Sequence, residues 1–448
     1  MKTLFFSVCL FLASVSATAQ QRYSQEMAQS QGKQWTHGKS WDYVNGLVAK
    51  SLLNLCEQYQ YADWTGNYYQ WAKEYADNAI NPDGTFKNFK KGNIDNINSG
   101  KVLFALYKRE KELDKQNGTD NANRYKKAAD FLHDYLVNDY SRIQSGDAKG
   151  CFFHKDIYPD QMWLDGLYMG AAFYAEWQAN FEPDNEQAWT DIAHQFKTIA
   201  RHTYDKDKQL YYHAWSANPE DSNSFWANKT EPYKGCSKEF WGRGMGWYFA
   251  ALVDVLEVMP KTHADYKELV TITNTVAKGL KRWQDKTSGV WYQLLQYDNS
   301  YVGECGIANY LESSASSMFT YAYLKGVRLG ILPKSYEKVA EKAYQGLLKT
   351  FVTSNNDGTI NLNQSCRSAG LGPAKDPSRD GSASYYLCGK DVTIVSNEGK
   401  AIGPFIMASL EYELKNDIYH ISVRIEHASF YLSAGKIYII DVSFLKLF

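Results

Sequence analysis

Apolar residues recur at helical spacing along most of this chain, whereas the alternation typical of half-buried strands is scarce before residue 415. The pattern predicts twelve helices, which would form six consecutive hairpins. They are expected near residues 22–31, 40–59, 63–80, 95–112, 121–137, 161–178, 186–202, 243–258, 264–283, 310–328, 335–350 and 397–414. We therefore expect an all-α fold.

The predicted helices fall into two kinds. Gly100–Leu106, Leu164–Ala175 and Gly246–Val258 are apolar on nearly every side, while the segments 121–137 and 335–350 each have a charged face. A helix that is apolar all round is buried, and an amphipathic helix covers a core with one face. The sequence therefore predicts an inner ring of buried helices inside an outer amphipathic ring.

The connections between these helices predict one large domain over residues 20–414. Long loops rich in Gly, Ser, Asp and aromatic residues occur at 138–160, 214–240 and 355–397, and no linker divides the chain. Loops of this length are commonly functional. Residues 415–448 form a separate tail with strand-like segments at 418–425, 429–432 and 436–445, either a small appended sheet or sequence that adds nothing to the fold.

The first nineteen residues have the pattern of a signal peptide. Lys2 provides the positive end, Leu4–Ala13 the apolar stretch, and Ala17-Thr18-Ala19 the small-residue cleavage site. The apolar stretch is too short to span a bilayer, so no membrane anchor is expected. We expect an exported protein, periplasmic or secreted after cleavage.

Six cysteines remain beyond the signal peptide, tens of residues apart and without a C-x-x-C pair. This spacing argues against a structural zinc site. One or two disulfides are possible in an oxidising compartment, but sequence does not fix the pairing.

Charge and aromatic content narrow the function. The 448 residues include 49 basic and 50 acidic side chains, so the chain has no net field to attract nucleic acid, and we expect no nucleic-acid partner. Aromatic residues make up 15% of the chain. Such a content favours carbohydrate recognition, because aromatic faces pack against the C–H side of sugars.

One loop-to-helix junction carries the strongest chemical signal. It places Arg243 between Trp241 and Trp247, with glycines at 242, 244 and 246 that allow a close approach. A guanidinium binds a carboxylate with paired hydrogen bonds, while indoles offer a platform for a sugar ring. The junction therefore predicts a site for a uronic acid sugar, although stacking of Arg on aromatic side chains inside a helical protein is an alternative.

Two aspartates are expected at the starts of inner helices. Asp165 lies in an apolar, aromatic segment that would raise its pKa by desolvation and keep it protonated as a general acid. Asp95 heads another predicted inner helix and would face the same cavity, where two carboxyls resist joint ionisation. Either residue is also explained as a helix cap.

His213 follows a helix and is flanked by aromatic residues, a setting that is more often that of a structural histidine than of a catalytic one. No His or acidic residue stands at metal-ligand spacing from it, so we expect no metal. The sequence also has no serine elbow, phosphate loop or dinucleotide glycine pattern, and we expect no cofactor.

Taken in order, these motifs resemble family 105 of the glycoside hydrolases, the unsaturated rhamnogalacturonyl hydrolases. The resemblance covers residues 24–414 and rests on the following segments: Trp163–Met169, Tyr212–Trp215, Trp241–Trp247, Asn309–Ser316, Ala369–Gly372, Arg379–Gly381 and Tyr385–Leu387. It implies an (α/α)6 barrel that removes a 4,5-unsaturated uronyl sugar from the non-reducing end of oligosaccharides made by polysaccharide lyases. The tail after residue 414 has no counterpart in this pattern.

The resemblance also implies a mechanism and the residues for it. Asp165 would protonate C4 of the enol ether and then take a proton from the water that attacks C5, after which the hemiketal opens. Asp95 would tune or position Asp165, and His213 with Arg243 would contact the substrate. The resemblance adds Tyr43 and Asn45 as further rim residues.

Two other functions stay open at this stage. The first is a family 88 type hydrolase that acts on unsaturated glycosaminoglycan or ulvan fragments, with the same chemistry and a different neighbouring sugar. The second is a sugar-binding protein without catalytic activity. The presence of both Asp95 and Asp165 favours an enzyme.

Overall fold

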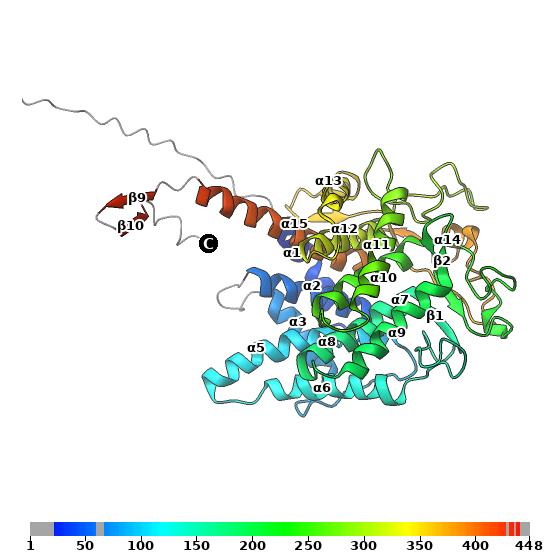
Figure 1. Cartoon of the computed structure of the whole chain (residues 1–448), viewed down its shortest axis with the longest axis horizontal. Coiled ribbons are helices and arrows are strands. Elements are labelled where there is room, and N and C mark those ends of the chain that lie inside the picture. Colours follow the sequence, from blue (N-terminus) through cyan, green and yellow to red (C-terminus); the bar gives the residue numbers. More distant parts are fainter. Residues whose placement is uncertain (1–21, 60–66, 427–429, 434–435, 440–448) are drawn as a thin grey trace, which may run out of the picture.

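The computed structural model describes residues 22–59, 67–426, 430–433 and 436–439. Helices dominate this part of the chain, and the strands are short and paired two by two (Figure 1). The expected all-α fold is confirmed. The predicted signal peptide lies outside the described residues.

Six inner helices form a closed ring within the described residues. They are α2 (Tyr43–Tyr59), α5 (Lys101–Asn117), α8 (Ala172–Phe181), α10 (Gly242–Val258), α12 (Ser313–Arg328) and α15 (Gly399–Glu426). Each packs against the next in this order, and α15 packs against α2. This closure makes the fold an (α/α)6 barrel.

The outer ring covers the inner one with amphipathic helices, as the sequence predicted. It consists of α1 (Tyr23–Thr36), α3 (Asn67–Ala79), α6 (Ala122–Asp134), α9 (Glu186–Thr203), α11 (Tyr266–Trp283) and α13 (Glu337–Phe351). Each packs against an inner neighbour, as α6 does against α5 and α13 against α12. The inner helices are therefore shielded on their outer side.

Small residues allow the inner helices to approach closely. In α10 an added Cβ at Gly242 would lie 3.1 Å from the Cβ of Ala315, and one at Gly246 would lie 2.7 Å from the Sδ of Met318. Both partners belong to α12. The glycines at these two positions therefore serve helix packing and not the approach of a ligand, which corrects the prediction.

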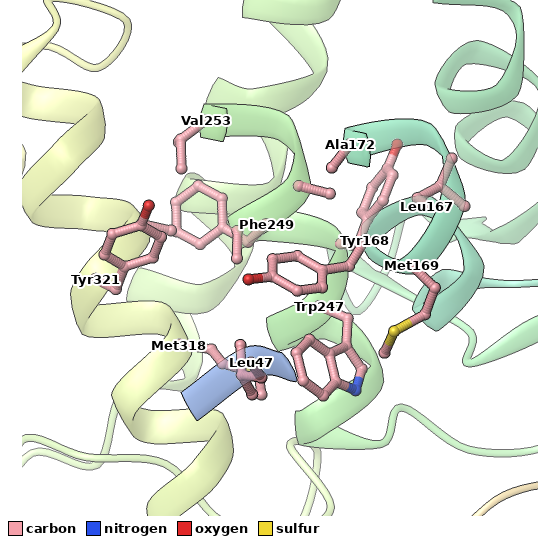
Figure 2. Close-up of a cluster of buried hydrophobic side chains, with 14 of the residues drawn as sticks. Leu47, Leu167, Tyr168, Met169, Ala172, Trp247, Phe249, Val253, Met318 and Tyr321 are labelled. Carbon is pink, nitrogen blue, oxygen red and sulfur yellow. The ribbon is translucent and has the colours of Figure 1, made fainter. Parts of the chain in front are cut away.

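A plug of apolar side chains fills the middle of the barrel. Trp247, Tyr168, Phe249 and Met318 lie in it, contributed by α10, α12 and the segment before α8 (Figure 2). Trp247 is 2% exposed and its ring lies 4.8 Å from that of Tyr168.

Several short elements lie at the end of the barrel where the inner helices begin. They are α4 (Asp95–Asn98), α7 (Leu164–Gly166), α14 (Ala383–Cys388), the 3-10 turn Ser222–Ser224, and the strand pairs β1 (Gln161–Trp163) with β4 (Ala214–Ser216) and β7 (Ser365–Cys366) with β8 (Ile394–Val395). In Figure 1 the labels β1 and α14 mark this end, on the right. The helix predicted from residue 161 instead begins as a strand, because Gln161–Trp163 pairs with another segment. The helix α14 was not predicted at all.

The remaining short elements flank the longer helices in the sequence. They are the π-helical turns Tyr135–Asp139 and Leu167–Ala171, the 3-10 turn Lys334–Tyr336, and the strand pairs β2 (Tyr204–Asp205) with β3 (Leu210–Tyr211) and β5 (Val352–Ser354) with β6 (Ile360–Leu362).

The C-terminal tail is partly helical. The strand predicted at 418–425 is wrong, because α15 continues to Glu426, and extending an existing helix adds a hydrogen bond for each residue fixed. Strands β9 (Phe430–Ser433) and β10 (Lys436–Ile439) do form an antiparallel pair. Residues 440–445 of the third predicted strand lie outside the described residues, and the domain boundary at 414 stays a prediction. No helix in the described ranges is long and apolar enough to cross a bilayer.

A cavity of about 440 Å³ lies at the opposite end of the barrel, beyond the plug. Its charged side chains are largely paired with one another: Lys50 with Glu176, Lys325 with Asp254 at 2.7 Å, and Arg328 with Glu411. Lys101 also borders it, and burial lowers the pKa of this lysine to about 7. Because this cavity shares no residue with the predicted site, its size does not make it the active site.

A disulfide between Cys305 and Cys388 ties α14 to a distant loop, across a sequence separation of 83 residues. Replacing Cys388 with Ser should lower the free energy of unfolding by up to about 4 kcal/mol, because the unfolded chain gains the entropy of the opened loop. Denaturant unfolding with and without a reductant measures this loss. The wild type should lose stability in reductant, while a variant that responds equally to reductant would contradict the assignment.

Candidate active site

A two-stranded pair brings the predicted acid and the predicted histidine together. In the pairing of β1 with β4, Trp163 lies opposite Ala214, and the backbone N–H of Leu164 donates to the carbonyl of His213 at 3.0 Å. Asp165 lies two residues after Trp163, and His213 lies directly before Ala214. The strand pair therefore sets two side chains 48 positions apart side by side.

The carboxylate of Asp165 is hydrogen-bonded to this histidine. His213 Nε2 lies 2.8 Å from Asp165 Oδ2, and the histidine is fully buried. Burial tends to raise the pKa of Asp165, but the contact with His213 outweighs it, so the pKa is lowered. The sequence-based expectation of a raised pKa is therefore wrong for the substrate-free protein, because the apolar surroundings were visible in the sequence and the histidine contact was not.

The second predicted carboxylate lies in its own charged pair. Asp95, at the start of α4, accepts a hydrogen bond from Lys155 Nζ at 2.7 Å and lies 3.9 Å from His154 Nε2. His154 stacks on Trp163 at 4.1 Å, and burial lowers the pKa of His154 to about 4, so this ring is neutral. Sequence reasoning missed both His154 and Lys155, although they belong to the long loop at 138–160 that it singled out.

The hydroxyl of Tyr43 lies near several of the predicted site residues. Burial raises the pKa of its hydroxyl well above the ordinary value, and the charges of Asp95, Arg243 and Asp165 also act on it. Three predicted site residues, each at or just before the start of an inner helix, are therefore close enough to act electrostatically on one hydroxyl. Asn45 does not join them, because its amide donates to the carbonyl of Ser40 at 3.1 Å and holds the loop before α2.

Arg243 is held by two groups that a buried carboxylate, Glu312, keeps in place. Its guanidinium is 1% exposed and donates to the carbonyl of Cys366 and, at 3.3 Å, to Ser314 Oγ. Glu312, which is fully buried, accepts from the backbone N–H of Cys366 at 2.9 Å and caps the start of α12. The acidic residue thus secures the strand whose carbonyl holds the arginine, a role that sequence reasoning did not assign to it.

The two predicted sugar-platform residues are buried in the substrate-free structure. Trp241 is 1% exposed and lies under Arg243, whose guanidinium carbon is 4.9 Å from the ring centre. Trp247 belongs to the plug of Figure 2. The alternative of Arg–aromatic stacking is therefore realised at Trp241, and neither indole presents an open face.

The middle glycine of the junction borders the site itself. A Cβ added at Gly244 would lie 2.9 Å from Cδ2 of His213. The absence of a side chain there allows the histidine to pack against α10. Among the described residues, His, Cys, Asp and Glu side chains do not gather in any group of three or more that could hold a metal ion.

This chain is similar to known glycoside hydrolases. The sequence profile of Glycosyl Hydrolase Family 88 matches residues 15–415. A solved structure of a family 105 glycoside hydrolase from C. acetobutylicum is 39% identical, with a TM-score of 0.76, and the match covers 88% of this chain and 100% of that one.

Curated sequences give the same relationship. The unsaturated rhamnogalacturonyl hydrolase YesR of Bacillus subtilis is 23% identical over 286 residues, which cover 63% of this chain and 73% of that protein. An unsaturated 3S-rhamnoglycuronyl hydrolase of an Alteromonas species is 28% identical over 151 residues, 34% of this chain and 33% of that protein. Because the family profile spans nearly the whole chain and the structural relative is matched along its full length, this chain belongs to the glycoside hydrolases of families 88 and 105.

Proposed function

We propose that this member of the unsaturated uronyl hydrolases removes the terminal 4,5-unsaturated uronyl residue from lyase-generated oligosaccharides by hydrating its double bond. The observation that carries the proposal is the hydrogen bond of 2.8 Å between Asp165 and His213 at a common end of the inner helices. Asp95, Lys155 and Tyr43 complete the surroundings of this pair.

In this reaction Asp165 acts twice. Its proton goes to C4 of the sugar while the oxygen of a water molecule bonds to C5, and the proton of that water returns to the carboxylate. The product is a hemiketal, which opens and releases the remaining sugar. The N–H of His213 stabilises the carboxylate that forms when Asp165 gives up its proton.

Substrate binding raises the pKa of Asp165, so that the carboxyl becomes protonated. In the free protein the pKa of Asp165 is lowered. A bound uronate brings a second negative charge and displaces water, and both effects raise the pKa of a nearby carboxyl. Lys155, whose side chain is 24% exposed, is an accessible cation for the uronate carboxylate, whereas Arg243 is buried.

We assign rhamnose as the neighbouring sugar, as in rhamnogalacturonan fragments. The similarity to YesR, whose name states such a substrate, supports this assignment. The 3S-rhamnoglycuronyl hydrolases support ulvan-type fragments as the second candidate. Incubation with unsaturated disaccharides from rhamnogalacturonan, ulvan and chondroitin, followed by loss of the ultraviolet absorbance of the conjugated double bond, separates the candidates. Binding without any loss of absorbance would support a sugar-binding protein instead.

Export remains part of the proposal. The signal-peptide pattern at residues 1–19 supports it, and so does the disulfide between Cys305 and Cys388, because disulfides persist mainly in oxidising compartments.

Replacing Asp165 with Asn should lower kcat by roughly 10³-fold, because the amide cannot donate a proton to carbon. The measurement is the rate of absorbance loss, with substrate affinity followed separately by calorimetry. Asp254→Asn is the matched control: it also lies on an inner helix, but it lines the cavity at the opposite end. An Asp165→Asn variant as active as the control would place the acid elsewhere.

Replacing Gly244 with Ala should lower kcat about tenfold with little change in KM, because the new methyl group displaces His213 from its contact with Asp165. Gly246→Ala adds the same group to the same helix, where it meets the flexible side chain of Met318. We expect this control to keep its activity. Equal effects of the two substitutions on kcat would show that the contact with His213 does not matter.

A further inference from the structure

A buried tyrosine continues the hydrogen-bonded pair of Asp165 and His213. Tyr386 lies in α14, is 0% exposed, and its hydroxyl is 2.6 Å from Nδ1 of His213. The other ring nitrogen, Nε2, is 2.8 Å from Asp165 Oδ2. The three side chains form one hydrogen-bonded line from α14 to the carboxylate, and the reaction as proposed above leaves Tyr386 without a role.

The direction of the hydrogen bonds follows from the available partners. Nδ1 of His213 is the hydrogen-bond partner that the structure gives for the hydroxyl of Tyr386. A buried phenol that only accepted a hydrogen bond would leave its own proton without a partner, which costs free energy. The hydroxyl therefore donates to Nδ1, and in the neutral ring the proton lies on Nε2, where it is donated to Asp165.

We propose that Tyr386 is a positioning residue that fixes His213 in the tautomer with its proton on Nε2, so that Asp165 always faces a hydrogen-bond donor. This inference rests on the proposed function for its catalytic consequence. In the other tautomer a lone pair on Nε2 would face Asp165 and accept its proton. The proton required at C4 of the sugar would then be held by a hydrogen bond to the histidine.

The surroundings of Tyr386 hold its ring in place. Its backbone carbonyl accepts from Gln293 Nε2 at 3.1 Å, and its ring stacks on Trp241 at 5.6 Å between centroids. Two residues further on, Cys388 is joined to Cys305. The short helix is therefore secured on both sides of the hydroxyl, as expected for a group whose direction matters.

Other charged groups act on this line of residues and must be separated from it in a pH experiment. Those that act on Asp165, on Tyr386 or on the neighbouring Tyr43 are Asp42, Asp95, His154, Glu239, Arg243, Arg379 and Tyr385, and Lys155 pairs with Asp95. Burial raises the pKa of Glu239 to about 7, so this carboxyl titrates within the pH range of the kinetic profiles. Glu239→Gln removes that titration and serves as the background for the profiles below.

The kinetic test is Tyr386→Phe, which removes only the hydroxyl. Without the donor at Nδ1 the ring can place its proton there, Asp165 loses its N–H donor, and the pKa of Asp165 rises. Because activity requires the protonated acid, the alkaline limb of the kcat profile should move to higher pH, and kcat at the plateau should fall about tenfold with KM little changed. Tyr323→Phe removes a buried hydroxyl that donates to the carbonyl of Ala277, and its profile should match the wild type.

A second measurement does not depend on turnover. Protein labelled with ¹⁵N at its nine histidines, with His213→Gln for assignment, reports the tautomer of His213 by NMR. We expect the Nε2–H form in the wild type and a shift toward Nδ1–H in Tyr386→Phe. An unchanged tautomer and an unchanged pH profile in Tyr386→Phe would overturn the proposal even if kcat fell, because that result describes a purely structural tyrosine.

The two measurements also separate this inference from the proposed function. If the wild type turns over none of the unsaturated disaccharides, the proposed function fails, and the NMR result alone decides whether Tyr386 sets the tautomer. If the wild type is active and the tautomer is the same in both proteins, the proposed function stands and the role of Tyr386 is refuted.

Discussion

The hydrogen bond between Asp165 and His213 is the interaction on which the site depends. A carboxylate among apolar side chains would normally be neutral, because burial disfavours its charge. Here the histidine reverses that balance and lowers the pKa of Asp165. The pairing of β1 with β4, the missing side chain at Gly244 and the hydroxyl of Tyr386 all serve to hold that one ring in place.

The buried charges where the inner helices begin are each bonded to neighbouring groups. Glu312 is satisfied by backbone N–H groups and by Ser314, and through Cys366 it fixes the carbonyl that receives Arg243. Charges that are buried without partners are costly, so each of these contacts also stabilises the fold. These buried groups lie beneath more accessible ones, among them Lys155, whose side chain is 24% exposed.

The two ends of the barrel differ in what their charges do. Beyond the apolar plug, the cavity has Lys50, Lys325 and Arg328 bonded to carboxylates of neighbouring helices, which joins the inner ring together. At the end where the helices begin, side chains of several inner helices converge on the hydroxyl of Tyr43 and on Asp165. The 440 Å³ cavity and the cluster of reactive groups therefore lie at opposite ends, and our proposed site follows the reactive groups.

Sequence determined the ring of paired helices, because helical periodicity and all-round apolar segments such as those in α10 are local properties of the chain. It also brought Asp165, Asp95, His213 and Arg243 to attention through their motifs. It could not show that Gln161–Trp163 is a strand, that Trp241 and Trp247 are buried, or that His154, Lys155 and Tyr386 belong to the site. Those facts depend on contacts between segments distant in the chain, and the same contacts decide the protonation of Asp165. Tertiary structure alone sets that state, because a pKa responds to the groups within a few ångströms of a carboxyl and not to its neighbours in sequence.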